Sequence, residues 1–386
     1  MSTSLFRSHE KRRFIDFNWV APVLLVVVII LGLLNLRNAD FYSADSFHQR
    51  QLKWYLLGML VCVVTAAVDL HLFYRASFLI YGVVNAALFA VLFTAPINNS
   101  RRWLPIFGEQ IQPSEFVKVA LALALARIIH DRPKDWRPTL DRKGIVELVK
   151  PYAALFLPVL LVFAEPDLGT AIIVMLVGLS VLFFDGIRWR SIVTIIGLTA
   201  LLFPVAWKFA LHEYQKDRVL VWWDPDALRE KAKHDPEAKK QLEKAYQPEQ
   251  AVLAIGSGEF YGKGGQQGHA GRQRSLPYLH TDFVIATWGE ERGFIGCSLL
   301  LVLYYLLVYW ALRVTKSGRD RFQVLLAAGI AGMLGWQFFV NVGMVTGLLP
   351  VVGVTLPLLS YGGSSVIAIF GGIGLLFNVV LRKRAT

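Results

Sequence analysis

Long apolar stretches dominate this chain and limit what it can fold into. Hydrophobic residues fill 55% of the 386 positions and charged residues only 18%, which is too apolar for a water-soluble chain with one packed core. A helix needs about 20 mostly apolar residues to cross the hydrocarbon of a bilayer. The pattern predicts an all-α polytopic membrane protein with about ten transmembrane helices, a single domain over 1–386. The candidate spans begin near Trp19, Trp54, Ser77, Phe116, Tyr152, Thr170, Ile192, Phe283, Phe322 and Thr355.

Two of these spans allow a second interpretation. Those between 152 and 184 are separated only by the turn Glu-Pro-Asp-Leu-Gly at 165–169, so two helices and a single re-entrant hairpin both fit. Within this turn Asp167 is expected to cap the following helix through its backbone donors, a structural role rather than a catalytic one. The first stretch is long for a signal core and no small-x-small cleavage site follows it, which predicts a retained helix.

The basic residues indicate how the chain is oriented. Short cytoplasmic loops collect Lys and Arg, and with the N-terminus inside, most of the Lys and Arg residues outside the longest loop fall on the inner side. The asymmetry predicts that both termini are cytoplasmic and that the number of spans is even. The net charge of +12 is mostly this signal; no aromatic-basic module suggests nucleic acid as a partner. The short outer loops hold only Arg37, Arg50, Lys53, Arg101 and Arg102.

The longest polar segment, 212–281, is predicted to be an extracytoplasmic loop between helices seven and eight. Asp224-Pro225 and Asp235-Pro236 each resemble an N-cap followed by proline, which predicts two short charged helices. The glycine-rich run at 255–265 contains Lys263 and allows backbone to approach a phosphate; a flexible hinge is the alternative. The run matches neither a P-loop nor a dinucleotide-binding loop.

Two groups of charged residues lie at predicted helix ends. Asp282 stands where the long loop gives way to a span, within Leu-His-Thr-Asp-Phe at 279–283. A carboxylate at a bilayer edge is a candidate for function, with helix capping as the alternative. Glu115 and Lys118 are three apart and can pair on one face of the fourth span, which Pro113 is expected to start. Their position favours a site role over a purely structural pair.

Small and polar residues gather near the C-terminus. Gly343 and Gly347 have the spacing of close helix packing. Tight packing and a broken helix explain the glycines but explain Asn341, Ser360 and Tyr361 less well.

Together these motifs resemble the SEDS family (shape, elongation, division and sporulation), and the chain is more similar to its RodA branch than to its FtsW branch. The resemblance implies a ten-helix membrane enzyme of the bacterial inner membrane. Its implied activity is that of a peptidoglycan glycosyltransferase, which polymerises lipid II into glycan strands outside the membrane for elongation of the cell wall. The matching segments are Arg102-Trp103, Gln112-Pro113-Ser114-Glu115 with Lys118, Pro166-Asp167-Leu168-Gly169-Thr170, Tyr214-Gln215 with Arg218, Gly256-Ser257-Gly258, Gly262-Lys263-Gly264, Leu276-Pro277 with His280-Thr281-Asp282-Phe283, and Ser360-Tyr361-Gly362-Gly363-Ser364.

The resemblance assigns Asp282 as the catalytic residue, and in this chemistry it acts as the general base. The departing undecaprenyl diphosphate needs cationic stabilisation from side chains or from a divalent cation, magnesium or manganese, whose ligands are unknown. No cofactor is assigned. The candidates for substrate binding or for the cavity are Arg102, Glu115, Lys118, Arg218, Lys263, His280, Thr281, Ser360 and Tyr361.

The chain departs from the family pattern at Tyr278, at Glu165 and in the segment 269–274, so loop contacts to lipid or partner are expected to differ.

The implied partners are a class B penicillin-binding transpeptidase and the membrane proteins of the elongation complex. A flippase for the lipid-linked precursor, an inactive scaffold and the division paralogue are the alternatives. The flippase is less favoured because the polar motifs gather on the outer side rather than deep in the spans or on both faces.

Overall fold

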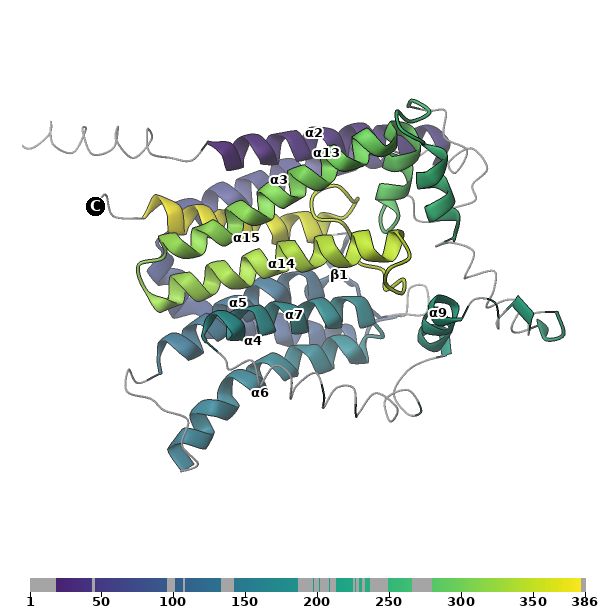
Figure 1. Ribbon diagram of the computed structural model, residues 1–386. Helices are drawn as coiled ribbons and strands as arrows, with labels where there is room; N and C mark the ends of the chain where they lie inside the picture. The colour runs from purple at the N-terminus through teal and green to yellow at the C-terminus, as the bar shows by residue number, and fades with distance from the viewer. Residues whose placement is uncertain are drawn as a thin grey trace, which may run out of the picture.

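The computed structural model describes residues 19–43, 46–95, 101–106, 108–132, 142–186, 197, 201, 208, 213–224, 226, 229–230, 233–236, 249–265 and 280–382. This part of the chain is mostly helical, and its long helices run along one another in a bundle (Figure 1). They are α2 (Val20–Ser43), α3 (Phe47–Ala67), α4 (Leu70–Val91), α5 (Pro113–His130), α6 (Arg142–Ala164), α7 (Leu168–Phe184), α13 (Val284–Val314), α14 (Arg321–Val345) and α15 (Gly363–Leu381).

Among the described residues, α2, α4, α13, α14 and α15 are long and apolar enough to cross a membrane, and α6 and α7 supply shorter apolar helices. Large apolar side chains cover the outside of the bundle; Val63 is 65% exposed and Leu79 is 70% exposed, as expected of a surface that faces lipid. The predicted span near Ile192 lies outside the described residues, as does most of the segment predicted to form two short helices after Asp224 and Asp235.

Helix α5 lies at the centre of the bundle. It packs against α4, α6, α7, α14 and α15, and most of its side chains are buried. Pro113 occupies its first turn, as the sequence predicted, because a proline there loses no intrahelical hydrogen bond. The central position of α5 explains how Glu115, in the same first turn, and Lys118, three residues later, come to be buried.

Helices α6 and α7 are separate and meet at a tight turn. Asp167 caps α7 by accepting a hydrogen bond from the backbone N–H of Thr170, at 3.2 Å, which confirms the predicted capping role. A Cβ on Gly169 would lie 2.3 Å from the carbonyl oxygen of Val352. The missing side chain therefore lets the start of α7 rest directly on the segment that follows α14.

The segment between α14 and α15 departs from the prediction. A span was expected to begin near Thr355, but residues 351–362 are not helical and α15 begins at Gly363. Buried irregular backbone is tolerated where side chains satisfy its polar groups, and here Tyr304 donates to the carbonyl of Pro357 and Tyr55 to that of Leu358. Apolar composition alone does not reveal this arrangement.

The two glycines of the predicted packing motif have different roles. A Cβ on Gly343 would lie 2.8 Å from the Leu349 side chain, so this position allows close packing, but of the irregular segment rather than of a second helix. Gly347 has a φ of +78° just after the end of α14, a backbone conformation in which glycine avoids strain.

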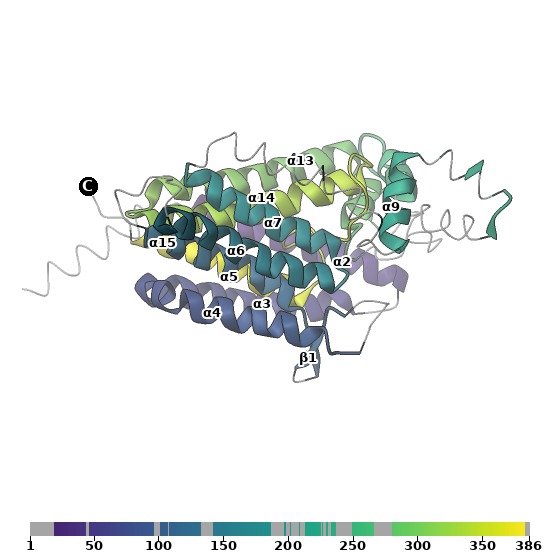
Figure 2. The ribbon, with the colours of Figure 1, turned by 90° about the horizontal axis from the view of Figure 1, so that it is seen from below.

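A short antiparallel hairpin was not predicted, and it corrects the all-α expectation. Strands β1 (Leu104–Ile106) and β2 (Glu109–Ile111) pair with Leu104 opposite Ile111, and Gly108 takes a φ of +81° between them. Strands of three residues carry too little alternation to be recognised in a sequence. Figure 2 shows the hairpin projecting from the bundle near one end of α4.

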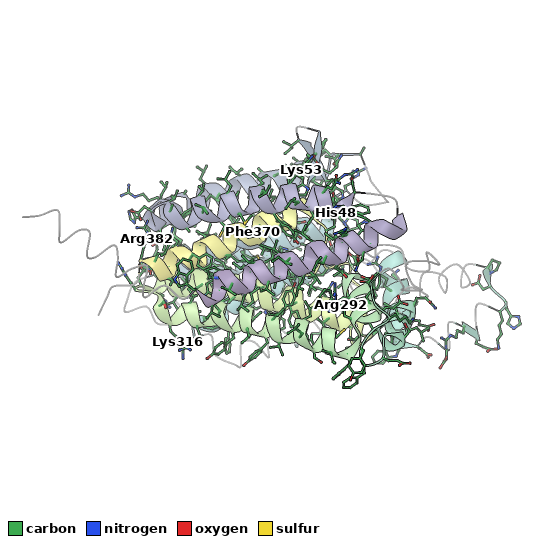
Figure 3. All side chains as sticks on the ribbon, turned by 90° about the horizontal axis from the view of Figure 1, so that it is seen from above. His48, Lys53, Arg292, Lys316, Phe370 and Arg382 are labelled. Atoms are coloured by element: carbon green, nitrogen blue, oxygen red, sulfur yellow. The ribbon has the colours of Figure 1, made fainter. Side chains whose placement is uncertain are left out.

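The two ends of the bundle carry different groups. Figure 3 shows Lys316 and Arg382 at one end and His48 and Arg292 at the other. Helix α9 (Glu213–Trp223) also lies at the latter end (Figure 1). The indole N–H of Trp222 on α9 donates to the carbonyl of Gly347, at 3.0 Å, so α9 is fixed where α14 ends.

Candidate functional site

Asp282 lies just before Phe283, the N-cap of α13, so the aspartate is not itself the capping residue. Side chains and backbone from the C-terminal part of the chain hold its main chain in place. The backbone N–H of Tyr361 donates to the carbonyl of His280, at 2.8 Å. Ser360 Oγ donates to the carbonyl of Thr281, at 2.6 Å. Asn341 Nδ2 donates to the carbonyl of Asp282, at 3.1 Å. The predicted cluster of Asn341, Ser360 and Tyr361 thus positions the turn that carries Asp282.

Gly353 brings Asp282 and Arg218 to the same place. A Cβ on this glycine would lie 3.4 Å from Asp282 Oδ2 and 3.9 Å from Arg218 Nη1. Arg218 reaches this point from α9, and its Nη1 donates to the carbonyl of Val351 at 3.1 Å. Gly353 has a φ of +74°, a backbone conformation in which glycine avoids strain, and its backbone lies beside both the carboxylate and the guanidinium.

Arg102 is held by the turn between α6 and α7. Its Nη2 donates to the carbonyl of Pro166 at 2.6 Å, and its Nε lies 3.7 Å from Asp167 Oδ2. Gln112 Nε2 also donates to this oxygen, at 3.2 Å. Gln112 and the electrostatic role of Asp167 were missed in the sequence, since they depend on contacts between distant segments.

The pKa of Asp282 reflects these neighbours. Burial raises it above the usual range for aspartate, because removal from water disfavours the charged form. Arg218, a hydrogen bond from Thr281 and the charge of Arg102 act in the opposite direction, while the Asp167 carboxylate adds to the rise. A carboxylate with a raised pKa is a stronger base than a solvated one, which suits proton abstraction.

Aromatic rings surround His280. Its imidazole stacks on Phe47 with ring centres 4.1 Å apart, and Tyr361 packs edge-on against Phe47 at 5.1 Å. Asp40 fixes the start of α3 by accepting from the backbone N–H groups of Phe47 and His48, at 2.9 and 3.0 Å. Nothing in the local sequence pointed to Phe47, at the start of α3, or to Asp40, in the last part of α2.

The predicted pair of Glu115 and Lys118 forms. Lys118 Nζ lies 2.8 Å from Glu115 Oε2, and the side chains are 1% and 9% exposed. No hydrogen bond joins this pair to Asp282 in the described part of the chain. Each group therefore satisfies the other inside the bundle, and the predicted role of the pair in a substrate cavity stays a prediction.

The glycine-rich run packs on the start of α13. A Cβ on Gly258 would lie 2.1 Å from the carbonyl oxygen of Gly289, and one on Gly262 would lie 2.2 Å from that of Glu291. Lys263 Nζ pairs with Glu290 Oε1 at 2.9 Å and donates to Ser257 Oγ at 2.7 Å. The glycines thus serve a close approach of backbone to a helix. Contact between Lys263 and a diphosphate stays a prediction.

Replacing Lys263 with methionine is expected to destabilise the folded protein by about 2 kcal/mol, because Glu290 would be left buried without its ion-pair partner. The Glu290 side chain is only 2% exposed. Thermal unfolding in detergent, followed by circular dichroism, measures the change. Lys233→Met is the control, since Lys233 pairs with Glu230 at the exposed surface. Equal melting temperatures for the two variants would contradict the structural role of the Lys263 pair.

Within the described residues, no group of three or more His, Cys, Asp or Glu side chains is arranged to hold a metal ion. The divalent cation considered from the sequence stays a prediction.

Comparison with known proteins identifies the relatives of this chain. The family model of the cell cycle proteins FtsW, RodA and SpoVE matches residues 15–385. The chain is 36% identical over 381 residues to the peptidoglycan glycosyltransferase MrdB of Escherichia coli K12, with 97% of each chain covered. It is 32% identical to stage V sporulation protein E of Bacillus subtilis, with 94% of this chain and 98% of the relative covered.

A solved structure has a similar fold. The rod shape determining protein RodA of Thermus thermophilus aligns with a TM-score of 0.68 at 29% identity, covering 96% of this chain and 98% of RodA. Family model, sequence identity and fold agree over nearly the whole length. The chain therefore belongs to the FtsW/RodA/SpoVE family, the SEDS proteins.

Proposed function

We propose that this protein is a peptidoglycan glycosyltransferase that polymerises lipid II into glycan strands at the outer face of the bacterial inner membrane. The observation that carries the proposal is the meeting of Asp282 and Arg218 beside Gly353. A base and a cation at one point are what transfer of a sugar from a diphosphate requires. The relative MrdB is itself a peptidoglycan glycosyltransferase.

In the proposed reaction Asp282 is the general base. Its carboxylate takes the proton of the acceptor sugar hydroxyl as the hydroxyl oxygen attacks the anomeric carbon of the donor. The bond between that carbon and the diphosphate oxygen breaks, and its electron pair leaves with undecaprenyl diphosphate. The proton then passes from Asp282 to solvent. Binding by Arg218 and Arg102 stabilises the charge that develops on the leaving diphosphate.

The side chains around Asp282 have supporting roles in this proposal. His280, Thr281, Ser360 and Tyr361 shape the acceptor side of the site, and the ring stack on Phe47 fixes the imidazole. Glu115 and Lys118 order the centre of the bundle beneath the site. Lys263 holds the loop at 255–265 against α13.

We extend the proposal to topology. Helix α2 begins and α15 ends at the same end of the bundle (Figure 1), which fits two cytoplasmic termini and an even number of spans, ten in all. Lys316 and Arg382 lie at this end (Figure 3), in accord with the preference of basic residues for the cytoplasm. The site then faces outward, with 212–281 as the extracytoplasmic loop of a single 1–386 domain.

The relatives favour a role in elongation and suggest a partner. RodA of Thermus thermophilus is a rod shape determining protein. This chain also aligns with a chain of a solved peptidoglycan synthase complex, which coordinates polymerization and crosslinking. The TM-score is 0.77 at 30% identity, and the alignment covers 96% of this chain and 99% of that chain. We propose that a class B penicillin-binding transpeptidase and membrane proteins of the elongation complex assemble with this chain.

The test of the proposed function is polymerisation of purified lipid II by the purified protein, with and without its cognate transpeptidase. Glycan strands resolved by gel electrophoresis are the expected product. Absence of product even with the transpeptidase would contradict the proposal. Transbilayer movement of fluorescent lipid II in liposomes would then support the flippase instead.

Replacing Asn341 with leucine is expected to lower kcat by about tenfold with little change in KM, because small misplacements of a catalytic group cost rate more than binding. Asn341 Nδ2 donates to Asp282 O at 3.1 Å and to Val354 O at 2.6 Å. Steady-state polymerisation rates measure the effect. Asn85→Leu is the control, since Asn85 Nδ2 donates within its own helix, to Tyr81 O. An equal loss in both variants would contradict a specific role for Asn341.

A further inference from the structure

Glu165 is a buried carboxyl that the mechanism above does not use. It follows the last residue of α6, and its side chain has 0% exposure. Neither Oε1 nor Oε2 has a hydrogen-bond partner in the described part of the chain. Buried polar atoms are nearly always bonded in folded proteins, and a buried carboxylate with no partner is costly. The neutral, protonated form of the carboxyl avoids most of this cost.

The neighbours of Glu165 belong to the site. The next residue, Pro166, has a φ of +31° and accepts from Arg102 Nη2 through its carbonyl. One residue further, Asp167 lies 3.7 Å from Arg102 Nε. The pKa of Glu165 is raised to about 9; burial is the largest cause, the Asp167 carboxylate adds to the rise, and Arg102 acts in the opposite direction. Glu165 thus carries a proton at neutral pH.

That proton sets the charge of the site. Arg102 and Arg218 supply two positive charges, and Asp167 and Asp282 supply two negative charges, so the four groups sum to zero. An ionised Glu165 would make the sum negative. Since the diphosphate of the substrate is itself an anion, a negative site would repel it.

Other charged groups near this turn leave the balance unchanged. On α5, which packs against both α6 and α7, Glu115 and Lys118 pair with each other. The segment 351–354, which touches the start of α7 through Val352, holds no titratable residue. The charges that act on Glu165 are therefore those of Asp167 and Arg102.

We propose that Glu165 is a positioning residue that works in its protonated form: as a neutral group next to the turn that holds Arg102, it keeps the guanidinium available to the diphosphate of the lipid-linked substrate. This inference rests on the proposed function for its substrate. It concerns a residue that touches no reacting atom and acts through Arg102. The proton on Glu165 also has a consequence for folding that is independent of catalysis.

The effect on stability follows from the two states of Glu165. In the unfolded chain a glutamate loses its proton near its usual pKa of about 4.3, whereas in the folded protein it keeps the proton up to a pH of about 9. At a pH below the unfolded pKa, Glu165 is neutral in both states and does not lower the free energy of unfolding. As the pH rises from the unfolded pKa toward the folded pKa, the unfolded chain loses the proton and the folded protein keeps it, so the free energy of unfolding falls progressively. Glu165→Gln removes this loss, because glutamine is neutral at every pH.

The experiment compares full-length wild type, Glu165→Gln and Glu109→Gln, each with the cognate transpeptidase. Lipid II polymerisation gives KM and kcat between about pH 7 and about pH 10, and thermal unfolding of each polymerase gives its melting temperature between about pH 5 and about pH 9. Glu109 is the matched control because it is exposed on β2. At each pH, the wild-type KM and kcat are divided by those of the variant. This division removes the effect of other ionisable groups, because the two proteins share them.

The expected result is that the wild-type KM, divided by that of Glu165→Gln, rises by about tenfold from pH 7 to pH 10, as Glu165 ionises above its pKa. The kcat ratio is expected to change little. The melting temperature of Glu165→Gln should exceed that of wild type by a margin that widens with pH, and Glu109→Gln should follow wild type throughout.

Two results would overturn the inference. One is a constant KM ratio together with parallel melting curves, which would mean that Glu165 holds no proton in the folded protein. The other is a large loss of activity in Glu165→Gln at every pH, which would mean that the carboxylate is the working form. If the wild type forms no glycan strands, the proposed function fails, but the melting curves still test the proton on Glu165.

Discussion

Replacing Asp282 with asparagine is expected to lower the rate of lipid II polymerisation by about a thousandfold, within the range measured for loss of a general base. Asparagine keeps the size of the side chain but cannot accept the proton of the acceptor hydroxyl. The main chain at 280–282 is held by Asn341, Ser360 and Tyr361, so the variant should fold normally. Polymerisation measured at matched melting temperature separates lost chemistry from lost structure.

The control for this variant is Asp224→Asn, which removes an exposed carboxylate just after α9 and should retain wild-type activity. Equal activity in Asp282→Asn and wild type would remove Asp282 from the mechanism and favour a scaffold. The wild-type rate should also rise with pH through a pKa above the usual aspartate value, since the base must be ionised and burial raises its pKa.

Features of the fold that depend on neighbouring residues were predictable from the sequence. Pro113 starts α5 and Asp167 caps α7, because both preferences arise within one helical turn. The ion pair of Glu115 and Lys118 follows from a spacing of three on a helix. Apolar length likewise located most of the long helices of the described chain.

Features that depend on distant contacts were not predictable. The apolar segment before α15 reads as part of a span, yet it is irregular because side chains from other helices, such as Tyr55 and Tyr304, satisfy its carbonyls. Lys263 reads as a free cation, yet it pairs with Glu290, 27 residues away. Periodicity cannot report such partners, since they are set by the packing of whole helices.

The same reasoning applies to the site. The motif at 279–283 and the family resemblance pointed to Asp282, but not to the contact at Gly353 that brings Arg218 beside it. That contact requires α9, the segment after α14 and the start of α13 to meet. The charge balance between Arg102, Asp167 and Glu165 is likewise a product of the fold.

Replacing Arg218 with glutamine is expected to lower kcat by about a hundredfold, in line with the loss of one group that stabilises a developing anion. Among the groups that lower the pKa of Asp282, Arg218 has the largest influence. Its removal should therefore raise that pKa further and move the acid limb of the pH–rate profile to higher pH. Initial polymerisation rates across the acid range measure both effects.

The control is Arg229→Gln, because Arg229 is also in the long loop but pairs with Asp226 and Glu249 at the surface. A loss of rate without a shift of the acid limb would show that Arg218 binds the diphosphate but does not tune Asp282. A shift without a loss of rate at the plateau would show the reverse. A loss of rate together with a shift of the acid limb would support the view that the Arg218 guanidinium acts on Asp282 and on the leaving diphosphate. A single cation can affect the two groups only if it lies close to each of them.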